Sequence, residues 1–274
     1  MMSVKADYHM HTSFSTDGKA LPEEMIKGCI NKGLKNICIT DHYDMDFPYY
    51  ERLGKDAFIF DADKYFEVLT DLKEKYKDKI DICIGAEFGL QPHLGKFYED
   101  MAKKYPFDFV IGSVHLVHGK DPYIGKLFDE TEDEIIYRET FEEILENIKN
   151  VKEFDVLGHI DYIVRYGKTK NEFYSYGKYK DIIDEILKAT IDSGRGIEMN
   201  MAGFKYKLGH PHPHPDIIKR YKELGGEIIT VGSDGHAPDQ VAYDYKKAGD
   251  ILKACGFDYY TIFKGRKPIF NKIV

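Results

Sequence analysis

The chain has 274 residues, which suits one large domain or two small ones and includes the length of a (β/α) barrel. Its formal net charge of -8 argues against a nucleic-acid-binding surface, although bound metal ions could still attract an anionic substrate. No linker, low-complexity tract or shift in composition interrupts the sequence, so we expect one domain over residues 1–274.

Strand-like and helical segments alternate along the chain. Short apolar runs predict strands over 35–40, 80–87, 107–115, 156–159, 196–200, 227–233 and 259–263. Helical patterns begin near residues 22, 63, 132, 179, 215 and 240, and the clearest, over 179–191, forms one apolar stripe. Prolines at 22 and 215 suit a first helical turn, and glycines at 33, 194 and 256 suit the residue after a last turn.

This alternation predicts an α/β fold with a parallel sheet. The near-continuous apolar run over 109–112 fits a strand that is buried on both faces. Polar side chains follow many strands, whereas an open sheet gathers its site at one switch point. We therefore expect a closed, TIM-barrel-like sheet with its site at the carboxyl ends of the strands.

The cysteines and the amino terminus favour a reducing compartment. The four cysteines stand singly and lack CxxC spacing, which favours buried thiols over disulfides or metal ligands. The sequence soon reaches Lys5 and Asp7, so we expect no signal peptide, and no apolar run approaches the roughly 20 residues of a membrane span. We expect a cytoplasmic protein without membrane contact, and the sequence does not predict its oligomeric state.

Histidine and carboxylate side chains stand at the ends of six strand-like runs. His9 and His11 are two residues apart, so they point the same way from an extended segment and can share a cation. A lone histidine at a strand end is usually structural, but six of the 11 histidines occupy such fragments. The candidate ligands are His9, His11, Asp17, His42, Glu87, His115, His159, Asp234 and His236.

This ligand set has consequences for the metal. Nine residues are too many for one ion with about four to six ligands, so we expect two or three divalent ions. Imidazole combined with carboxylate favours zinc, iron or manganese over calcium or magnesium.

The fragments resemble the polymerase and histidinol phosphatase (PHP) superfamily, and within it the histidinol-phosphate phosphatase type. The resemblance extends from His9 to about Pro268. It implies a distorted (β/α)7 barrel with a trinuclear metal centre. It rests on His9-x-His11, Thr40-Asp41-His42, Gly85-Ala86-Glu87, residues 108–115, Gly158-His159-x-Asp161 and Gly232-Ser233-Asp234-x-His236.

The resemblance also implies how the ligands divide among the ions. One ion would be bound by His9, His11, Glu87 and Asp234, a second by Glu87, His115 and His159, and a third by Asp17, His42 and His236. Glu87 would then bridge two ions, because a carboxylate has two oxygens. Aspartate at position 17, where many members carry histidine, is associated with the histidinol phosphatase type. Glu87 and Asp234 are the expected catalytic ligands.

The activity implied is hydrolysis of L-histidinol phosphate, a small phosphorylated metabolite of histidine biosynthesis, without a covalent protein nucleophile. Arg165, six residues past His159, is the first candidate for a catalytic, phosphate-binding cation. After Asn200 the family pattern is Thr-Ser-Gly-hydrophobic-Arg, and this chain has Met-Ala-Gly-Phe followed by Lys205. Lys205 can meet phosphate as a point charge but lacks the bidentate fork of arginine. We expect Arg165, Lys205 and Asn200 to bind substrate, and Arg195 to lie on the opposite face.

Alternative interpretations remain open at this point. A phosphoesterase of the same fold could act on another small phosphate ester, and a non-catalytic, metal-stabilised PHP module belongs to a different class. The intact ligand set favours an enzyme. The His210-Pro-His212-Pro-His214 tract resembles a metal-binding sequence, but its proline rhythm is more typical of a stiff loop that points its histidines at solvent.

Overall fold

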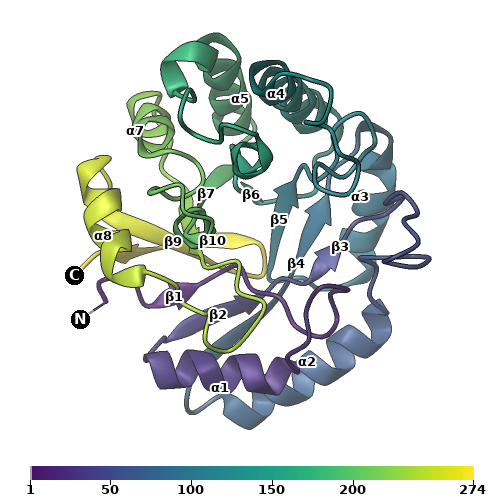
Figure 1. The fold of residues 1–274 in the computed structure, drawn as a ribbon. Helices are drawn as coiled ribbons and strands as arrows, with labels where there is room; N and C mark the ends of the chain where they lie inside the picture. Colours follow the sequence, from purple (N-terminus) through teal and green to yellow (C-terminus); the bar gives the residue numbers. More distant parts are fainter. Residues whose placement is uncertain (1) are drawn as a thin grey trace.

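The computed structural model describes residues 2–274, and its centre is a parallel sheet curved into a nearly closed barrel (Figure 1). One edge strand is β1 and the other is β8, and Tyr8 N donates to Val231 O at 3.0 Å where the two edges meet. In order across the sheet, the strands are β1 (Ala6–Asp7), β2 (Asn36–Ile39), β4 (Asp81–Gly89), β5 (Phe109–Ser113), β6 (Val156–Leu157), β7 (Gly196–Asn200) and β8 (Ile229–Gly232). A further short strand, β3 (His42–Tyr43), pairs with the end of β4.

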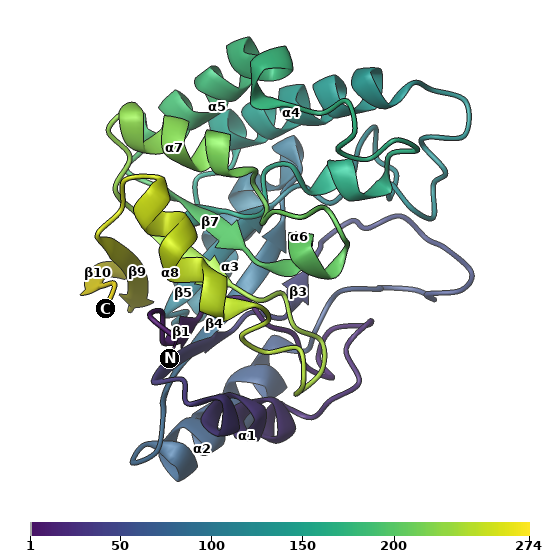
Figure 2. The same ribbon diagram turned by 60° about the vertical axis from the view of Figure 1, so that its left-hand side comes forward.

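Helices surround the barrel strands in Figure 1. The α-helices are α1 (Pro22–Lys32), α2 (Ala62–Tyr76), α3 (Gly95–Lys104), α4 (Asp133–Asn150), α5 (Lys180–Asp192), α6 (Ala202–Lys205), α7 (Pro215–Glu223) and α8 (Tyr245–Ala254). Three 3₁₀ turns accompany them: η1 (Pro92–Leu94), η2 (Tyr162–Tyr166) and η3 (Tyr176–Tyr179). In Figure 2 the long connecting loops lie on the right and both termini on the left, so the two ends of the barrel differ in character.

A separate antiparallel hairpin, β9 (Tyr259–Lys264) and β10 (Lys267–Lys272), covers the amino-terminal end of the barrel. Phe263 of β9 packs against Phe109, with ring centroids 5.0 Å apart, and its carbonyl accepts a hydrogen bond from the Tyr8 hydroxyl at 2.9 Å. The run over 259–263 is thus a strand, but its place as a unit of the parallel sheet was predicted wrongly. Because the hairpin covers the amino-terminal end of the barrel, a site can form at the carboxyl ends of the strands.

Most helix starts agree with the sequence pattern. Helices near residues 22, 63, 132, 179 and 215 begin within one residue of the expected position. The last helix begins at Tyr245 rather than near 240, because Ala242 and Asp244 have positive φ angles of 51° and 54° that interrupt a helix. Gly33, with φ of 79°, ends α1 in the left-handed conformation that suits glycine. Helix α3 was not predicted, and β1 was expected only as the extended segment that leads to His9 and His11, without a range.

The four cysteines are buried and unpaired, as expected from their isolated positions. They belong to an apolar core whose members range from Val4 to Ile273. None of the helices over residues 2–274 combines the length and apolar character that a bilayer crossing requires.

Candidate metal centre

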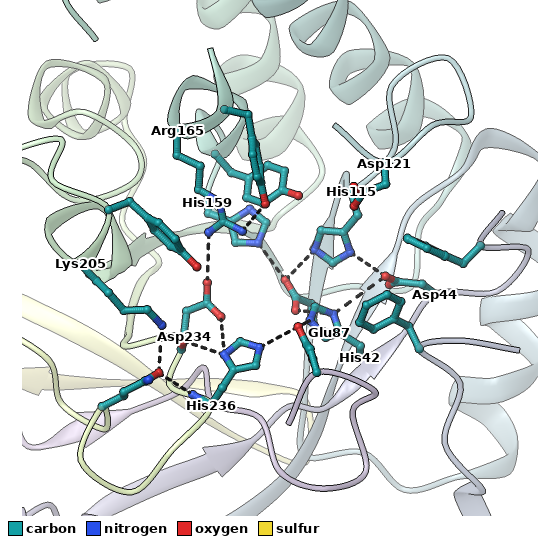
Figure 3. Close-up of a pocket in the computed structure, with 17 residues that line it drawn as sticks. His42, Asp44, Glu87, His115, Asp121, His159, Arg165, Lys205, Asp234 and His236 are labelled. Carbon is teal, nitrogen blue, oxygen red and sulfur yellow. Dashed lines mark hydrogen bonds and ion pairs between the residues drawn. The ribbon is translucent and has the colours of Figure 1, made fainter. Parts of the chain in front are cut away.

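The nine candidate ligands gather at the carboxyl ends of the barrel strands. Figure 3 labels those that line the cavity above them, namely His42, Glu87, His115, His159, Asp234 and His236. Glu87 stands near the end of β4 and His42 begins the short strand β3, and the other seven lie in the segments that follow β1, β5, β6 and β8. Register explains part of this arrangement, because His42 of β3 stands opposite Glu87 of β4. Asp234 follows β8 and has a positive φ of 51°, a strained conformation for a residue other than glycine.

Glu87 lies at the centre of the cluster and is fully buried. Its Oε1 lies 2.9 Å from His159 Nε2 and 3.2 Å from His115 Nε2. Its Oε2 lies 3.2 Å from His9 Nε2 and 3.0 Å from His42 Nδ1. Burial alone would raise the pKa of Glu87, but the surrounding imidazoles hold that pKa well below its ordinary value. The carboxylate is therefore anionic, and its two oxygens face two different pairs of imidazoles.

A second group forms where the chain leaves β1 and β8. His11 Nε2 lies 3.1 Å from His9 Nε2 and 3.3 Å from Asp234 Oδ1. Burial, and then the neighbouring imidazoles of His42 and His236, lower the pKa of His11 to about 3. His11 is thus neutral near pH 7, which is the state in which imidazole binds a metal.

The third group lies nearer the surface. His236 Nε2 is 3.1 Å from Asp17 Oδ2, and His42 Nε2 is 3.9 Å from the same oxygen. The ring of His11 stacks on both histidines, with centroids 4.2 Å from His42 and 4.3 Å from His236. His11 therefore belongs to two groups, and the division of ligands among individual ions stays a prediction.

Two further carboxylates contact Nδ1 of His9 and of His115, the ring nitrogens that do not face Glu87. Glu198 Oε1 lies 2.6 Å from His9 Nδ1, and Asp44 Oδ2 lies 2.9 Å from His115 Nδ1. Such contacts fix which ring nitrogen carries a proton and leave the other free for a metal. Neither role was predicted from the sequence. For Glu198, a signal was available: it is an acidic residue within the predicted strand 196–200.

The residues fit a group of divalent ions. Glu87 Oε2 and His42 Nδ1 are buried without a hydrogen-bond partner, although they lie only 3.0 Å apart. Buried polar atoms that lack a partner are costly unless something else, such as a cation, satisfies them. The mixture of imidazole and carboxylate donors suits zinc and related transition metals.

A cavity of about 270 Å³ opens over this cluster. In Figure 3, Arg165 and Lys205 lie on one side of Glu87, and Asp44 and Asp121 lie on the other. Two phenylalanines also line the cavity near His42, namely Phe47 and Phe58. The cavity thus combines cations at one side with acidic and aromatic groups at the other.

The family model described as the PHP domain matches residues 7–202 of the chain. The chain belongs to the PHP domain family. It is 34% identical over 264 residues to a probable histidinol-phosphatase of Clostridium acetobutylicum, and the aligned region covers 96% of this chain and 95% of the relative. It is 32% identical over 274 residues to a histidinol-phosphatase of Lactococcus lactis subsp. lactis, covering 98% of this chain and 97% of the relative.

Solved structures agree with this membership. The crystal structure of the Lactococcus lactis histidinol phosphate phosphatase, complexed with zinc, L-histidinol and phosphate, superposes with a TM-score of 0.87. The two chains are 30% identical, and the match covers 97% of this chain and 98% of the other. A putative histidinol phosphatase of Listeria monocytogenes shares the fold at 20% identity, with a TM-score of 0.77. The predicted PHP barrel fold is confirmed.

Two of the three residues predicted to bind substrate line the cavity of this PHP chain, and the third does not. Arg165, on η2, and Lys205, at the end of α6, line the cavity, and Lys205 Nζ donates to Gln240 Oε1 at 2.9 Å. Burial lowers the pKa of Lys205 from its ordinary value. Asn200 is buried and does not line the cavity, and both ends of its amide contact protein groups: Oδ1 accepts from Ala202 N at 2.9 Å, and Nδ2 donates to Glu198 Oε2 at 3.2 Å. Its direct contact with substrate remains a prediction without support from this geometry.

The histidine-proline tract was predicted wrongly, because His210 and His212 are buried rather than turned to solvent. Residue 212 forms two backbone hydrogen bonds with Asn200, of 2.7 and 2.8 Å, which draw the tract against the end of β7. The His212 ring then meets a buried carboxylate, with Nδ1 2.6 Å from Asp161 Oδ1. His214 caps α7 by accepting from Asp216 N. The tract therefore packs against the end of β7 and the buried Asp161.

Arg195 lies away from the cavity, as its position at the start of β7 predicted. Its guanidinium packs over the Phe154 ring at 4.0 Å and donates to the carbonyls of Ile148 and Val151, each at 3.2 Å. These contacts account for it as a structural residue.

Proposed function

We propose that this PHP chain is a metal-dependent phosphomonoesterase that hydrolyses L-histidinol phosphate to L-histidinol and phosphate. The observation that carries the proposal is a cavity in which two cationic side chains, Arg165 and Lys205, face the buried cluster around Glu87. The near full-length similarity to histidinol-phosphatases supports the substrate, and so does the structural match to a complex with zinc, histidinol and phosphate.

We further propose that the nine candidate ligands hold two or three divalent transition-metal ions. Zinc is supported by the Lactococcus lactis complex, and iron and manganese suit the same donor set. Ions bound there would lower the pKa of a bound water toward about 7 and neutralise charge on the phosphoryl oxygens.

The residues of the chain have separate tasks in this proposal. Glu87 stays anionic and presents one oxygen to each of two imidazole pairs, so it can join two ions. Arg165 and Lys205 hold phosphoryl oxygens and orient the ester toward the ions. Asp121, with Phe47 and Phe58, supplies acidic and apolar surface that suits a cationic, partly aromatic leaving group.

The test compares kcat/KM for L-histidinol phosphate and p-nitrophenyl phosphate in zinc-reconstituted protein. A dedicated enzyme should prefer histidinol phosphate by at least about a hundredfold, or roughly 2.7 kcal/mol of transition-state discrimination. The ammonium and imidazole ends must supply this preference, because the phosphate is common to both esters. A ratio near one, or failure to support growth of a histidine auxotroph that lacks this step, would favour a phosphoesterase of broader tolerance.

A further inference from the structure

Three tyrosine rings surround the guanidinium of Arg165. Its Cζ lies 4.2 Å from the ring centroids of both Tyr162 and Tyr206 and 4.9 Å from that of Tyr166. The Arg165 side chain is only 12% exposed, and the three tyrosines all line the cavity beside it. We call Tyr162, Tyr166 and Tyr206 the tyrosine cage.

In the described part of the chain, no carboxylate oxygen lies within hydrogen-bonding distance of the Arg165 guanidinium. Over residues 2–274, the acidic oxygen within 4.0 Å of the guanidinium is Asp234 Oδ2, at 3.9 Å from Nη1. That aspartate also faces His11 and His236, at 3.3 and 3.7 Å. A buried charge is ordinarily paired, and here the three tyrosine rings within 5 Å contribute cation–π stabilisation in place of a close carboxylate.

The guanidinium also keeps unused hydrogen-bond donors. Its Nη2 donates to the Tyr166 hydroxyl at 2.7 Å, and this is the one hydrogen bond that its nitrogens make within the described part of the chain. Nε is buried without a partner. Rings that stack on the flat face of a guanidinium leave the N–H groups at its edge available, whereas a bidentate carboxylate would occupy them.

The cage spans two separate segments of the chain. Tyr162 and Tyr166 belong to η2 together with Arg165, and Tyr206 follows α6, directly after Lys205. The Lys205 Nζ lies 5.5 Å from the Tyr206 ring, so this ring is close to both cations that face the cavity. Tyr206 is therefore placed to fix Arg165 relative to Lys205.

We propose that the tyrosine cage positions Arg165 and keeps its donors free for an anionic phosphoryl group, with Tyr206 as the principal positioning residue. This inference rests on the proposed phosphatase function, because it assigns the charge of Arg165 to a phosphate. A cage of ring faces holds the cation in place without neutralising it, which suits a site whose ligand is an anion.

The test measures binding of inorganic phosphate to the zinc-loaded protein by calorimetry, with zinc content and thermal unfolding recorded for each variant. Tyr206→Leu should weaken phosphate binding roughly 5- to 30-fold, the range expected for a desolvated cation–π contact. Tyr206→Phe keeps the ring face and should bind within about twofold of the parent. Phe173→Leu is the matched control, because it removes an exposed ring that lies near Lys178 and does not line the cavity.

A double-mutant cycle separates positioning from a general structural role. In an Arg165→Ala background, Tyr206→Leu should change phosphate binding by less than about twofold, because the cation that it positions is gone. An equal loss in both backgrounds would overturn the proposal, and so would an equal loss in Tyr206→Phe and Tyr206→Leu.

The probe also separates this proposal from the assigned substrate. Inorganic phosphate lacks the leaving group, so a poor preference for L-histidinol phosphate would refute the substrate and leave the cage result intact. Unchanged phosphate binding in a folded, zinc-loaded Tyr206→Leu variant would refute the cage and leave the substrate preference intact.

Discussion

Glu198 should control how tightly the site binds zinc, although it is not one of the candidate ligands. Its Oε1 lies 2.6 Å from His9 Nδ1, and both side chains are about 1% exposed. The carboxylate charge favours a proton on Nδ1 and leaves Nε2 of His9 free for a cation. Glu198→Gln preserves the shape of the side chain but removes this charge. An amide oxygen at the Oε2 position can still accept from His159 N and Asn200 Nδ2, and the amide nitrogen then faces His9 Nδ1, so the contact with His9 is the one that changes.

Two independent magnitudes give the size of the effect. A hydrogen bond that involves a charged group contributes about 1.5–3 kcal/mol. Loss of a carboxylate that orients a metal-binding histidine costs about 10- to 100-fold in affinity, which corresponds to about 1.4–2.7 kcal/mol. We therefore expect zinc to bind about 10- to 100-fold more weakly to the ligand group that contains His9.

Competition with a chelator of known zinc affinity, followed by elemental analysis of the retained zinc, measures this change. Glu139→Gln is a matched control, because Glu139 Oε2 also lies 3.0 Å from a histidine nitrogen, that of His118, but both side chains are exposed. The control should bind zinc as the parent does. A folded Glu198→Gln variant with the affinity of the parent would refute the role assigned to the His9–Glu198 contact.

Other variants and conditions test the remaining assignments. Glu87→Gln should lower metal content and kcat together, since each of its oxygens faces imidazoles; normal stoichiometry with a normal rate would contradict a bridging role. Arg165→Ala should lower kcat/KM about tenfold to a hundredfold with zinc content unchanged, while Lys205→Arg should be neutral or beneficial; the opposite ranking would return Arg165 to a structural role. Burial lowers the pKa of His42, but Glu87 and Asp17 raise that pKa to about 9 in the metal-free protein. Zinc must displace this proton, so near pH 7 binding should release protons and should strengthen as the pH rises toward 9. Calorimetry in buffers of different ionisation enthalpy measures the release, and an absence of proton uptake by the buffer would contradict it.

The barrel was predictable from the sequence because its signals are local. Apolar runs of strand length alternate with helical patterns, and a parallel barrel places every strand's carboxyl end on one face. His42, Glu87 and Asp234 follow such runs, so their approach to one another needs no knowledge of side-chain packing. Their roles as metal ligands remain predictions that the metal-binding experiments test.

Other features depend on contacts that the sequence does not reveal. The run over 259–263 has the apolar character of a strand, but this character cannot distinguish a parallel barrel strand from one arm of an antiparallel hairpin. Burial of His212 follows from pairing with Asn200 and from the carboxylate of Asp161, and neither contact is local in sequence. The contact between Asp44 and His115 also joins residues that are far apart in the sequence.

The seam between the first and last barrel strands has a consequence for motion. His9 and His11 leave β1, and Asp234 and His236 leave β8, on either side of the contact between Tyr8 and Val231. An ion bound across this seam would act as a reversible cross-link between the two edges of the sheet. Such a link opposes local opening of the barrel more than it opposes fluctuation of the outer helices. Loss of metal should therefore expose the backbone amides along this seam to solvent exchange before those of the central strands.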